Sequence, residues 1–265
     1  MKNNIELFHP THAEQAVFTA SHFISLRKKK LKCNPIISKH IILGFFPHLY
    51  GYIRKKYTCA NEFAIHHGHS YLNFIHQKTM FSFIFIGYGA PLAGMLLDES
   101  IALGGENFIF LGPAGSLSPD TCKGMVSLPT SAIRDEGTSF HYEEVSRYSY
   151  PHPELTRFIQ ETLVNKHVDF NTGRNWTTDA IYRETPGKIQ SALSDEAITV
   201  DMEASALFSI ARHYQKRIAG LFLITDHITP DSFNVAQKNK DNSRITANEL
   251  FDISLNILHD FSNSQ

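Results

Sequence analysis

The stretch Val200-Asp-Met-Glu-Ala-Ser-Ala-Leu-Phe208 is the part of the chain from which fold and function are best argued. β-branched residues precede it, and residues 204–212 carry apolar side chains at helical spacing, so a strand or loop passes here into a helix. Asp201 and Glu203 stand at this junction. Both carboxylates could cap the helix. Alternatively, Glu203 faces a pocket and accepts hydrogen bonds from a vicinal diol such as ribose, with Met202 as an apolar contact beside it. From these residues alone, capping is the simpler interpretation.

Length and charge indicate one globular domain without a general affinity for nucleic acid. The chain has 265 residues, enough for a single large domain with a sizeable core, and no change in composition marks a second one. Its 25 Lys and Arg residues balance 26 Asp and Glu residues, which gives a formal net charge of -1. A nucleic-acid partner is therefore not expected.

The cysteines and the N-terminal segment indicate the compartment. Cys33, Cys59 and Cys122 are odd in number and far apart, which fits a reducing compartment better than a disulfide framework. Residues 1–20 carry several charges and no continuous apolar core, so they do not form a signal peptide. No window is long and apolar enough to span a membrane. We therefore expect a soluble, cytoplasmic protein without a membrane partner.

Apolar, β-branched segments alternate with segments of helical periodicity, and this alternation predicts an α/β fold. Residues 1–34 are polar and basic, with weak helical periodicity near 13–26, and form an extension to the domain predicted at 35–265. Strands are expected at 35–43, 81–86, 107–111, 125–128, 172–178 and 218–225, and helices at about 90–103, 153–166, 204–212 and 246–261.

A glycine turn, Gly87-Tyr-Gly89, follows the strand predicted at 81–86. A dinucleotide-binding fingerprint would need a third glycine where Leu92 stands, and no acid follows at the required distance, so we discount NAD. A turn of this kind still brings backbone amides close to an anion or a sugar. A tight turn with no ligand explains it equally well.

Polar side chains gather in two loops and at one strand end. Arg134-Asp-Glu136 opens the first loop and forms either a functional cluster or a structural salt-bridge network. The loop at 175–185 carries aromatic and polar side chains that could line a flat ring. Asp226 ends a buried strand, the usual place for ligand chemistry in open α/β sheets. It is either a general acid whose pKa is raised by burial, or an ordinary turn residue.

Taken together, these segments resemble the nucleoside phosphorylase family, which includes purine nucleoside phosphorylases, uridine phosphorylases and methylthioadenosine nucleosidases. They occur in family order over roughly residues 35–228, and the ordered set is specific although each member is weak. The two loops look most similar to the uridine-phosphorylase-like branch. The matching segments are Gly87-Tyr-Gly-Ala-Pro91, Leu111-Gly-Pro-Ala-Gly-Ser-Leu117, Arg134-Asp-Glu-Gly-Thr-Ser-Phe-His-Tyr142, Trp176-Thr-Thr-Asp-Ala-Ile-Tyr-Arg-Glu-Thr185, Val200–Phe208 and Thr225-Asp226.

The resemblance implies a single α/β domain built on a twisted mixed β-sheet flanked by helices, assembled as a homodimer or hexamer. It also implies cleavage of an N-glycosidic bond. Glu203 would hold the ribose hydroxyls, and Asp226 would protonate a purine at N7 as the base leaves. This charge distribution lowers the barrier because positive charge develops on the sugar and negative charge on the base. The remaining nucleoside contacts are assigned to Met202, Ala114, Gly115, Ile181 and Tyr182.

Three departures from the family pattern concern the phosphate-binding half of the site. By resemblance, the first phosphate-binding arginine would stand where this chain has His48, four residues after Gly44. The second arginine is replaced by Phe110, and the hydroxyl residue after the following glycine is replaced by Pro113, which has no amide hydrogen. The third arginine, lent by a neighbouring subunit, would fall near His67. The candidate phosphate contacts that remain are Gly44, His48, His67 and Gly87.

Two further positions limit the substrate and the cofactor. The run His66-His-Gly-His69 is better explained as a polar loop than as a metal site, because no further ligand stands at a fixed spacing. The glutamine and arginine that bind the pyrimidine in uridine phosphorylases fall at Thr185 and Gly187 here. A standard uracil pocket is therefore not expected.

We predict a nucleoside phosphorylase that cleaves a nucleoside, with purines favoured, using phosphate as co-substrate and no cofactor. Phosphate binding should be weak or pH-dependent, because histidine is mostly neutral at pH 7 whereas arginine is always charged. Two alternatives remain: a hydrolytic nucleosidase, and a nucleoside-binding protein without turnover. Product analysis with and without phosphate separates the three.

Overall fold

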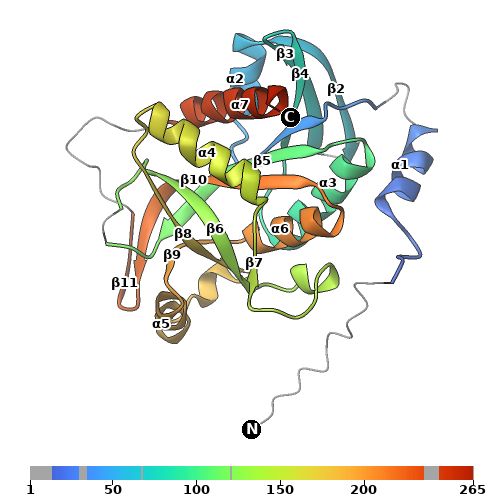
Figure 1. Ribbon diagram of the computed structural model, residues 1–265. Coiled ribbons are helices and arrows are strands. Elements are labelled where there is room, and N and C mark those ends of the chain that lie inside the picture. The colour runs from blue at the N-terminus through green and yellow to red at the C-terminus, as the bar shows by residue number, and fades with distance from the viewer. Residues whose placement is uncertain (1–13, 30–34, 67, 120, 236–244, 265) are drawn as a thin grey trace.

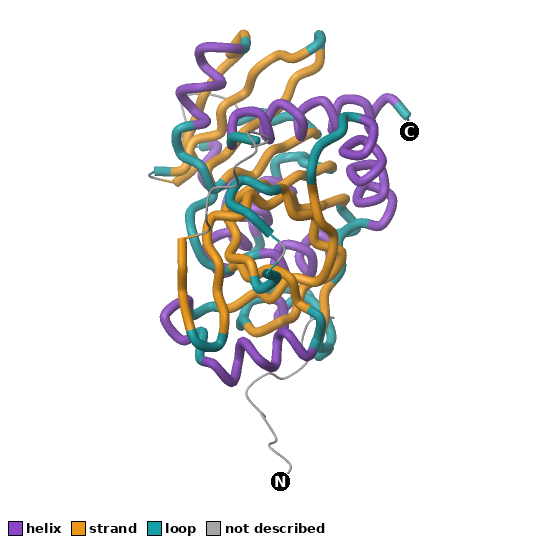
Figure 2. The backbone as a smooth tube through the Cα atoms, turned by 90° about the vertical axis from the view of Figure 1, so that its left-hand side faces the viewer, coloured by secondary structure: helices purple, strands orange, loops and turns teal. Residues whose placement is uncertain are grey.

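A computed structural model describes residues 14–29, 35–66, 68–119, 121–235 and 245–264. Eleven described strands form one mixed sheet, and helices lie on both of its faces (Figure 1). In Figure 2 the strands occupy the middle of the molecule and the helices lie around them. The predicted fold, a single α/β domain with a mixed sheet flanked by helices, is confirmed.

The elements follow in chain order. The strands are β1 (His40–Gly44), β2 (Thr58–His66), β3 (His69–His76), β4 (Thr79–Phe85), β5 (Asn107–Ser116), β6 (Val126–Asp135), β7 (Tyr148–Ser149), β8 (Phe170–Thr178), β9 (Ala197–Asp201), β10 (Arg217–Thr229) and β11 (Ser232–Val235). The helices are α1 (Ala20–Lys28), α2 (Leu49–Lys56), α3 (Ala90–Ala102), α4 (Pro153–Asn165), α5 (Pro186–Ser194), α6 (Ala204–His213) and α7 (Ala247–Asn263), with short 3-10 turns at Ser139–His141 and Ile181–Arg183.

Five of the strands close into a ring. β5 pairs with β10 on one side and with β9 on the other. β10 continues to β6, β6 to β8, and β8 back to β9. The remaining sheet extends from β5 through β1, β4 and β3 to β2. The closure was not predicted, because apolar patterning identifies a buried strand but not the strand beside it.

Two large apolar cores lie on the two faces of the sheet. One joins α2, α4 and α7 to the strands, and the other joins α3 and α6 to them. The helix α1, in the predicted N-terminal extension, lies outside α3 and contributes Ile24 to the second core. No helix of the described residues combines the length and the apolar character needed to cross a membrane.

The first strand is shorter than the apolar pattern predicts. It begins at His40 rather than Pro35, because the backbone before it is held by side chains instead of a neighbouring strand. The amide of Ser38 donates to Oγ of Ser82 (2.8 Å). Conversely, β5 and β10 continue to Ser116 and Thr229, beyond the predicted ends, and these extra residues carry candidate site groups.

Of the hairpins β2–β3–β4, only the strand β4 was predicted, at 81–86; β2, β3 and the helices α2 and α5 were not predicted. β3 and β4 are joined by a two-residue turn in which Gln77 and Lys78 have φ of 49° and 67°. Such a turn usually contains Asn or Gly, so this one carries no recognisable signal. β2 is an edge strand whose first five residues are exposed, which hides its alternation.

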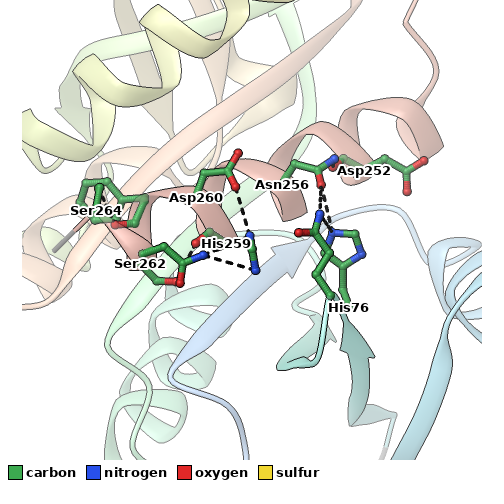
Figure 3. A network of polar contacts seen from close by, with 10 residues as sticks. His76, Asp252, Asn256, His259, Asp260, Ser262 and Ser264 are labelled. Atoms are coloured by element: carbon green, nitrogen blue, oxygen red, sulfur yellow. Dashed lines mark hydrogen bonds and ion pairs between the residues drawn. The ribbon is translucent and has the colours of Figure 1, made fainter.

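A polar network fixes the C-terminal helix α7 to the turn between β3 and β4 (Figure 3). Nε2 of His76 lies 3.0 Å from Oδ1 of Asn256 on α7. Nearer the start of α7, Asp252 accepts hydrogen bonds from the hydroxyls of Tyr52 (2.6 Å) and Tyr57 (2.5 Å). The network therefore connects α7 to α2 and to the end of β3.

Candidate functional site

The two carboxylates at the start of α6 have separate roles. Oδ2 of Asp201 accepts from the amides of Ala204 (2.7 Å) and Glu203 (3.1 Å), so this residue caps the helix. Its Oδ1 accepts from Asn175 (2.6 Å) and Thr177 (2.7 Å). The capping interpretation holds for Asp201 alone, because the side chain of Glu203 makes no capping bond.

Glu203 instead turns toward the glycine turn that opens α3. Its Oε1 accepts from the amide of Gly89 (2.5 Å), and the residue is 6% exposed. Burial first, and then repulsion from Asp201, raises the pKa of this carboxyl well above its usual range. A buried carboxyl group beside a glycine turn is costly for stability and is typical of a binding site.

Asp226 lies against Gly115 on the ring of strands. The β10 ladder is irregular between Ile224 and Asp226, and this bulge places Asp226 opposite Gly115 of β5. A Cβ atom on Gly115 would lie 2.8 Å from Oδ2 of Asp226 and 3.0 Å from Val200, so any other residue here would have to displace these side chains. The hydroxyl of Thr225 donates to Oδ1 of Asp226 (2.5 Å). Residues 115, 200 and 226 therefore form one row across three strands.

The other predicted nucleoside contacts are divided. Ala114 is buried beside Gly115, and Met202 is half-buried next to Glu203. Ile181 and Tyr182 lie on a 3-10 turn with 51% and 95% of their surface exposed. The structure thus gathers the first two near the strand ends and leaves the last two at the surface.

Glu184 is an acid near Asp226 that the sequence did not single out. Burial first, and the charge of Asp226 second, raises its pKa to about 7. One indirect indication of Glu184 was present in the sequence, since this residue belongs to the segment 176–185 that resembles the family. The base end of the candidate site therefore contains two carboxyl groups rather than one.

The predicted phosphate half is lined by aromatic side chains. Phe45, directly after Gly44, is buried, and a Cβ atom on Gly112 would lie 2.7 Å from its ring. The Tyr88 ring lies 6.5 Å from the Phe45 ring. Phe110 is fully buried between Phe208 and Phe222, with ring centroids 5.7 and 5.6 Å away. Phe45 and Phe110 offer no anion-binding group, and the hydroxyl of Tyr88 is the one hydrogen-bond donor among these three side chains.

The histidines proposed as replacements for arginine lie in different places. His48 is exposed just before α2, and its ring lies 5.9 Å from that of Phe46. His67 lies outside the described residues. His69 approaches the Gly87 turn instead: a Cβ atom on Gly87 would lie 3.7 Å from its Cε1. No group of three or more His, Cys, Asp or Glu side chains within the described ranges is arranged to hold a metal ion.

The loop after β6 is organised by Arg134, but not through the ion pairs that the sequence suggested. The guanidinium donates to Oγ of Ser139 (2.8 Å), to the Glu144 carbonyl (2.7 Å) and to Oγ of Ser146 (2.8 Å). The alternative of a salt-bridge network with Asp135 or Glu136 does not hold, because Asp135 pairs with Lys188 at 2.8 Å and Glu136 accepts from the backbone amides of Thr138 and Ser139. The role of Arg134 in the described structure is to shape the loop.

Solved structures share this fold. The chain superimposes on AMP nucleosidase from Bacteroides thetaiotaomicron with a TM-score of 0.74, covering 93% of this chain and 99% of that one at 22% identity. It superimposes on uridine phosphorylase from Vibrio fischeri with a TM-score of 0.72, covering 86% and 93% at 21% identity.

The sequence places the chain in a family. The phosphorylase superfamily profile matches residues 39–259, so the chain belongs to the phosphorylase superfamily, as predicted. Its relatives include guanosine phosphorylase of Halorubrum lacusprofundi, which is 25% identical over 61% of this chain and 72% of its own length. Uridine phosphorylase of Thermococcus kodakarensis is 24% identical over 71% and 73%. The relatives thus include enzymes named for purine and for pyrimidine nucleosides.

Proposed function

We propose that this protein cleaves the N-glycosidic bond of a nucleoside, with purines favoured, and transfers the ribosyl group to phosphate. The observation that carries the proposal is the placement of two carboxyl groups on either side of β5: Glu203 follows β9, Asp226 lies on β10, and both strands pair with β5. Glu203 is bonded to Gly89, and Asp226 lies against Gly115. Membership of the phosphorylase superfamily supports the same chemistry.

The proposed mechanism assigns one step to each carboxyl group. Glu203 holds the ribose hydroxyls, and the electron-rich environment stabilises the positive charge that develops on the sugar ring. Asp226 donates a proton to N7 of the purine, so that the base leaves as a neutral molecule. Ala114 and Gly115 flank the base, and Met202 packs under the nucleoside. No metal or organic cofactor takes part in these steps.

Hydrolysis is the second candidate, and a specific observation favours it. Phe110, which is fully buried, stands where the family pattern has an anion-binding arginine, and Phe45 and Tyr88 add further aromatic rings near Gly44 and Gly112. Water does not need anion-binding side chains, so it could accept the ribosyl group where phosphate binds weakly. A protein that binds nucleosides without turnover would fit the same lining.

A panel of nucleosides incubated with and without phosphate tests the proposal. Ribose 1-phosphate formed only with phosphate supports phosphorolysis, whereas free ribose in phosphate-free buffer identifies hydrolysis. Binding without product would identify the non-catalytic protein. When Glu203 is replaced by alanine in this assay, the variant Glu161→Ala is the matched control, because Glu161 is an exposed carboxylate on α4.

The compartment, the oligomeric state and the metabolic role of the protein are also part of the proposal. We infer a cytoplasmic homodimer or hexamer that serves purine salvage, since a small soluble nucleoside is the expected substrate. Light scattering after size-exclusion chromatography would give the oligomeric state, and a monomer at all concentrations would contradict that part.

A further inference from the structure

A cavity of about 710 Å³ lies where the start of α4, the end of α6 and the start of β10 meet. Its lining includes Arg157 on α4, Arg212 and Lys216 at the end of α6, and Ile218 on β10. Glu203 immediately precedes α6, and Arg212 stands nine residues further along, which corresponds to about 14 Å of helix. The cavity is therefore separate from the candidate nucleoside site.

Three cationic side chains line this cavity, those of Arg157, Arg212 and Lys216. Among the described residues that line it, none is an Asp or a Glu. The side chains of Arg157 and Arg212 are 74% and 66% exposed, so a ligand can reach their guanidinium groups. Lys216 is half-buried and forms no ion pair within the part of the chain that the structure describes.

The acids near the two arginines leave most of the guanidinium donors available. Nε of Arg212 lies 3.2 Å from Oε1 of Glu143, which occupies one of the five N–H donors of this guanidinium. Nε of Arg157 lies 3.9 Å from Oε1 of Glu161, and an exposed pair at this distance contributes little to stability. The positive charge on this side of the molecule is therefore open to a ligand.

Positive charge also acts on His152, which precedes α4 and belongs to the same lining. Burial first, and then the charge of Arg217, lowers the pKa of this imidazole, whereas Glu154 acts more weakly in the opposite direction. The N-terminal end of α4, which begins at Pro153, adds a partial positive charge at the same place. The cavity is thus a region of positive potential.

We propose that this cavity binds a small organic phosphate, an aromatic body that carries a phosphate dianion. A guanidinium can donate two parallel hydrogen bonds to a phosphate, and the Lys216 ammonium adds a compact charge. The ring of the ligand would lie against Tyr150, which is 49% exposed, and against the exposed Pro153. A cationic ligand would meet no carboxylate among the described lining residues, so these groups favour an anion.

The test compares phenyl phosphate with phenol, which share one ring and differ in the phosphate. Calorimetric titration of the full chain should show saturable binding of phenyl phosphate, with phenol at least about tenfold weaker. Inorganic phosphate lacks the ring and should bind at least about threefold more weakly than phenyl phosphate. Absence of phenyl phosphate binding, or equal affinities for phenyl phosphate and phenol, would overturn the proposal. Equal affinities for phenyl phosphate and inorganic phosphate would overturn the placement of the ring.

Variants locate the binding in this cavity. Lys216→Gln removes one positive charge, and should weaken phenyl phosphate about tenfold and leave phenol unchanged. Lys166→Gln is the matched control, because Lys166 is exposed at the opposite end of α4, and it should bind phenyl phosphate normally. If circular dichroism shows that Lys216→Gln does not fold, Gln160→Glu places a negative charge at an exposed position of the lining without changing any of the three cations. Unchanged binding of phenyl phosphate in either cavity variant, or an equal loss in Lys166→Gln, would refute the site.

Discussion

The two halves of the candidate nucleoside site are built from opposite kinds of side chain. Around Glu203 and Asp226, carboxyl groups are held against glycine backbones, which is unfavourable for folding unless a ligand uses them. Around Phe45 and Phe110, aromatic rings fill the space and stabilise the fold without a ligand. Burial alone therefore does not indicate function; buried groups that destabilise the free protein do.

The largest expected effect is at the ribose end. Replacing Glu203 with alanine removes the acceptor for the ribose hydroxyls, so kcat/KM for a purine nucleoside should fall by at least about 1000-fold. Circular dichroism should show an intact fold. Full activity in this variant would return the residue to a purely structural role, and Glu161→Ala serves as the control.

The base end should show the next largest effect. Asp226→Asn removes the proton donor, and kcat for purine nucleosides should fall about 100-fold. A nitrophenyl riboside, whose leaving group needs no proton, should lose much less. An equal loss on both substrates would mean that Asp226 positions the nucleoside rather than protonating it.

The contact between the strands gives a smaller prediction. In Gly115→Ala the new methyl group would lie 2.8 Å from Oδ2 of Asp226 and displace that carboxyl. We expect about a tenfold loss of kcat/KM and a loss of about 1–3 kcal/mol in the free energy of unfolding. The control is Gly51→Ala, where nothing lies within 4 Å of the added atom; comparable losses there would contradict the contact.

A positive charge added to the phosphate half of the site should improve phosphate binding. His48→Arg restores the guanidinium that the family pattern places there, and should lower KM for phosphate by a factor of about 2–5. The measurement is phosphorolysis at varied phosphate and fixed nucleoside. No change would show that the exposed position of His48 is too far from the acceptor.

The smallest effect concerns stability and pH. Because the pKa of Glu203 is raised from 4.5 to about 8 in the folded protein, the folded state binds more protons than the unfolded state between these two pH values. This contribution to stability is present at low pH and is lost as pH rises through the folded pKa. Glu203→Gln removes the penalty, so the variant should be more stable than the parent by at least about 1 kcal/mol at pH 8 and equal near pH 4. Chemical denaturation at both pH values checks this, and a variant less stable at pH 8 would refute it.

The buried strands were the most predictable part of the fold. Continuous apolar runs such as 107–111 and 218–225 identified β5 and β10, and helical periodicity identified α4, α6 and α7. The β3–β4 turn was not predictable, because Gln77 and Lys78 adopt positive φ without the residues that favour it. Ring closure was also beyond the sequence, since it depends on pairing between β5 and β10, about a hundred residues apart.

The site was predictable only in part. The acids Asp201 and Glu203 were identified together, but their separate roles depend on which amide each one reaches. Glu184 was missed because its raised pKa comes from burial and from Asp226, which lies 42 residues away in sequence. The packing of Phe45 over Gly112 could not be predicted, because the two residues are far apart in the sequence and meet only in the folded protein.

The ring of strands also determines when the candidate site can exist. β10 carries Asp226 and is the last of the five ring strands to be synthesised, long after its partner β5. Until β10 docks, the chain has neither a closed ring nor its proton donor. Closure of the ring and completion of the site therefore both require β10, and a nascent chain that ends before β10 would lack the proposed proton donor.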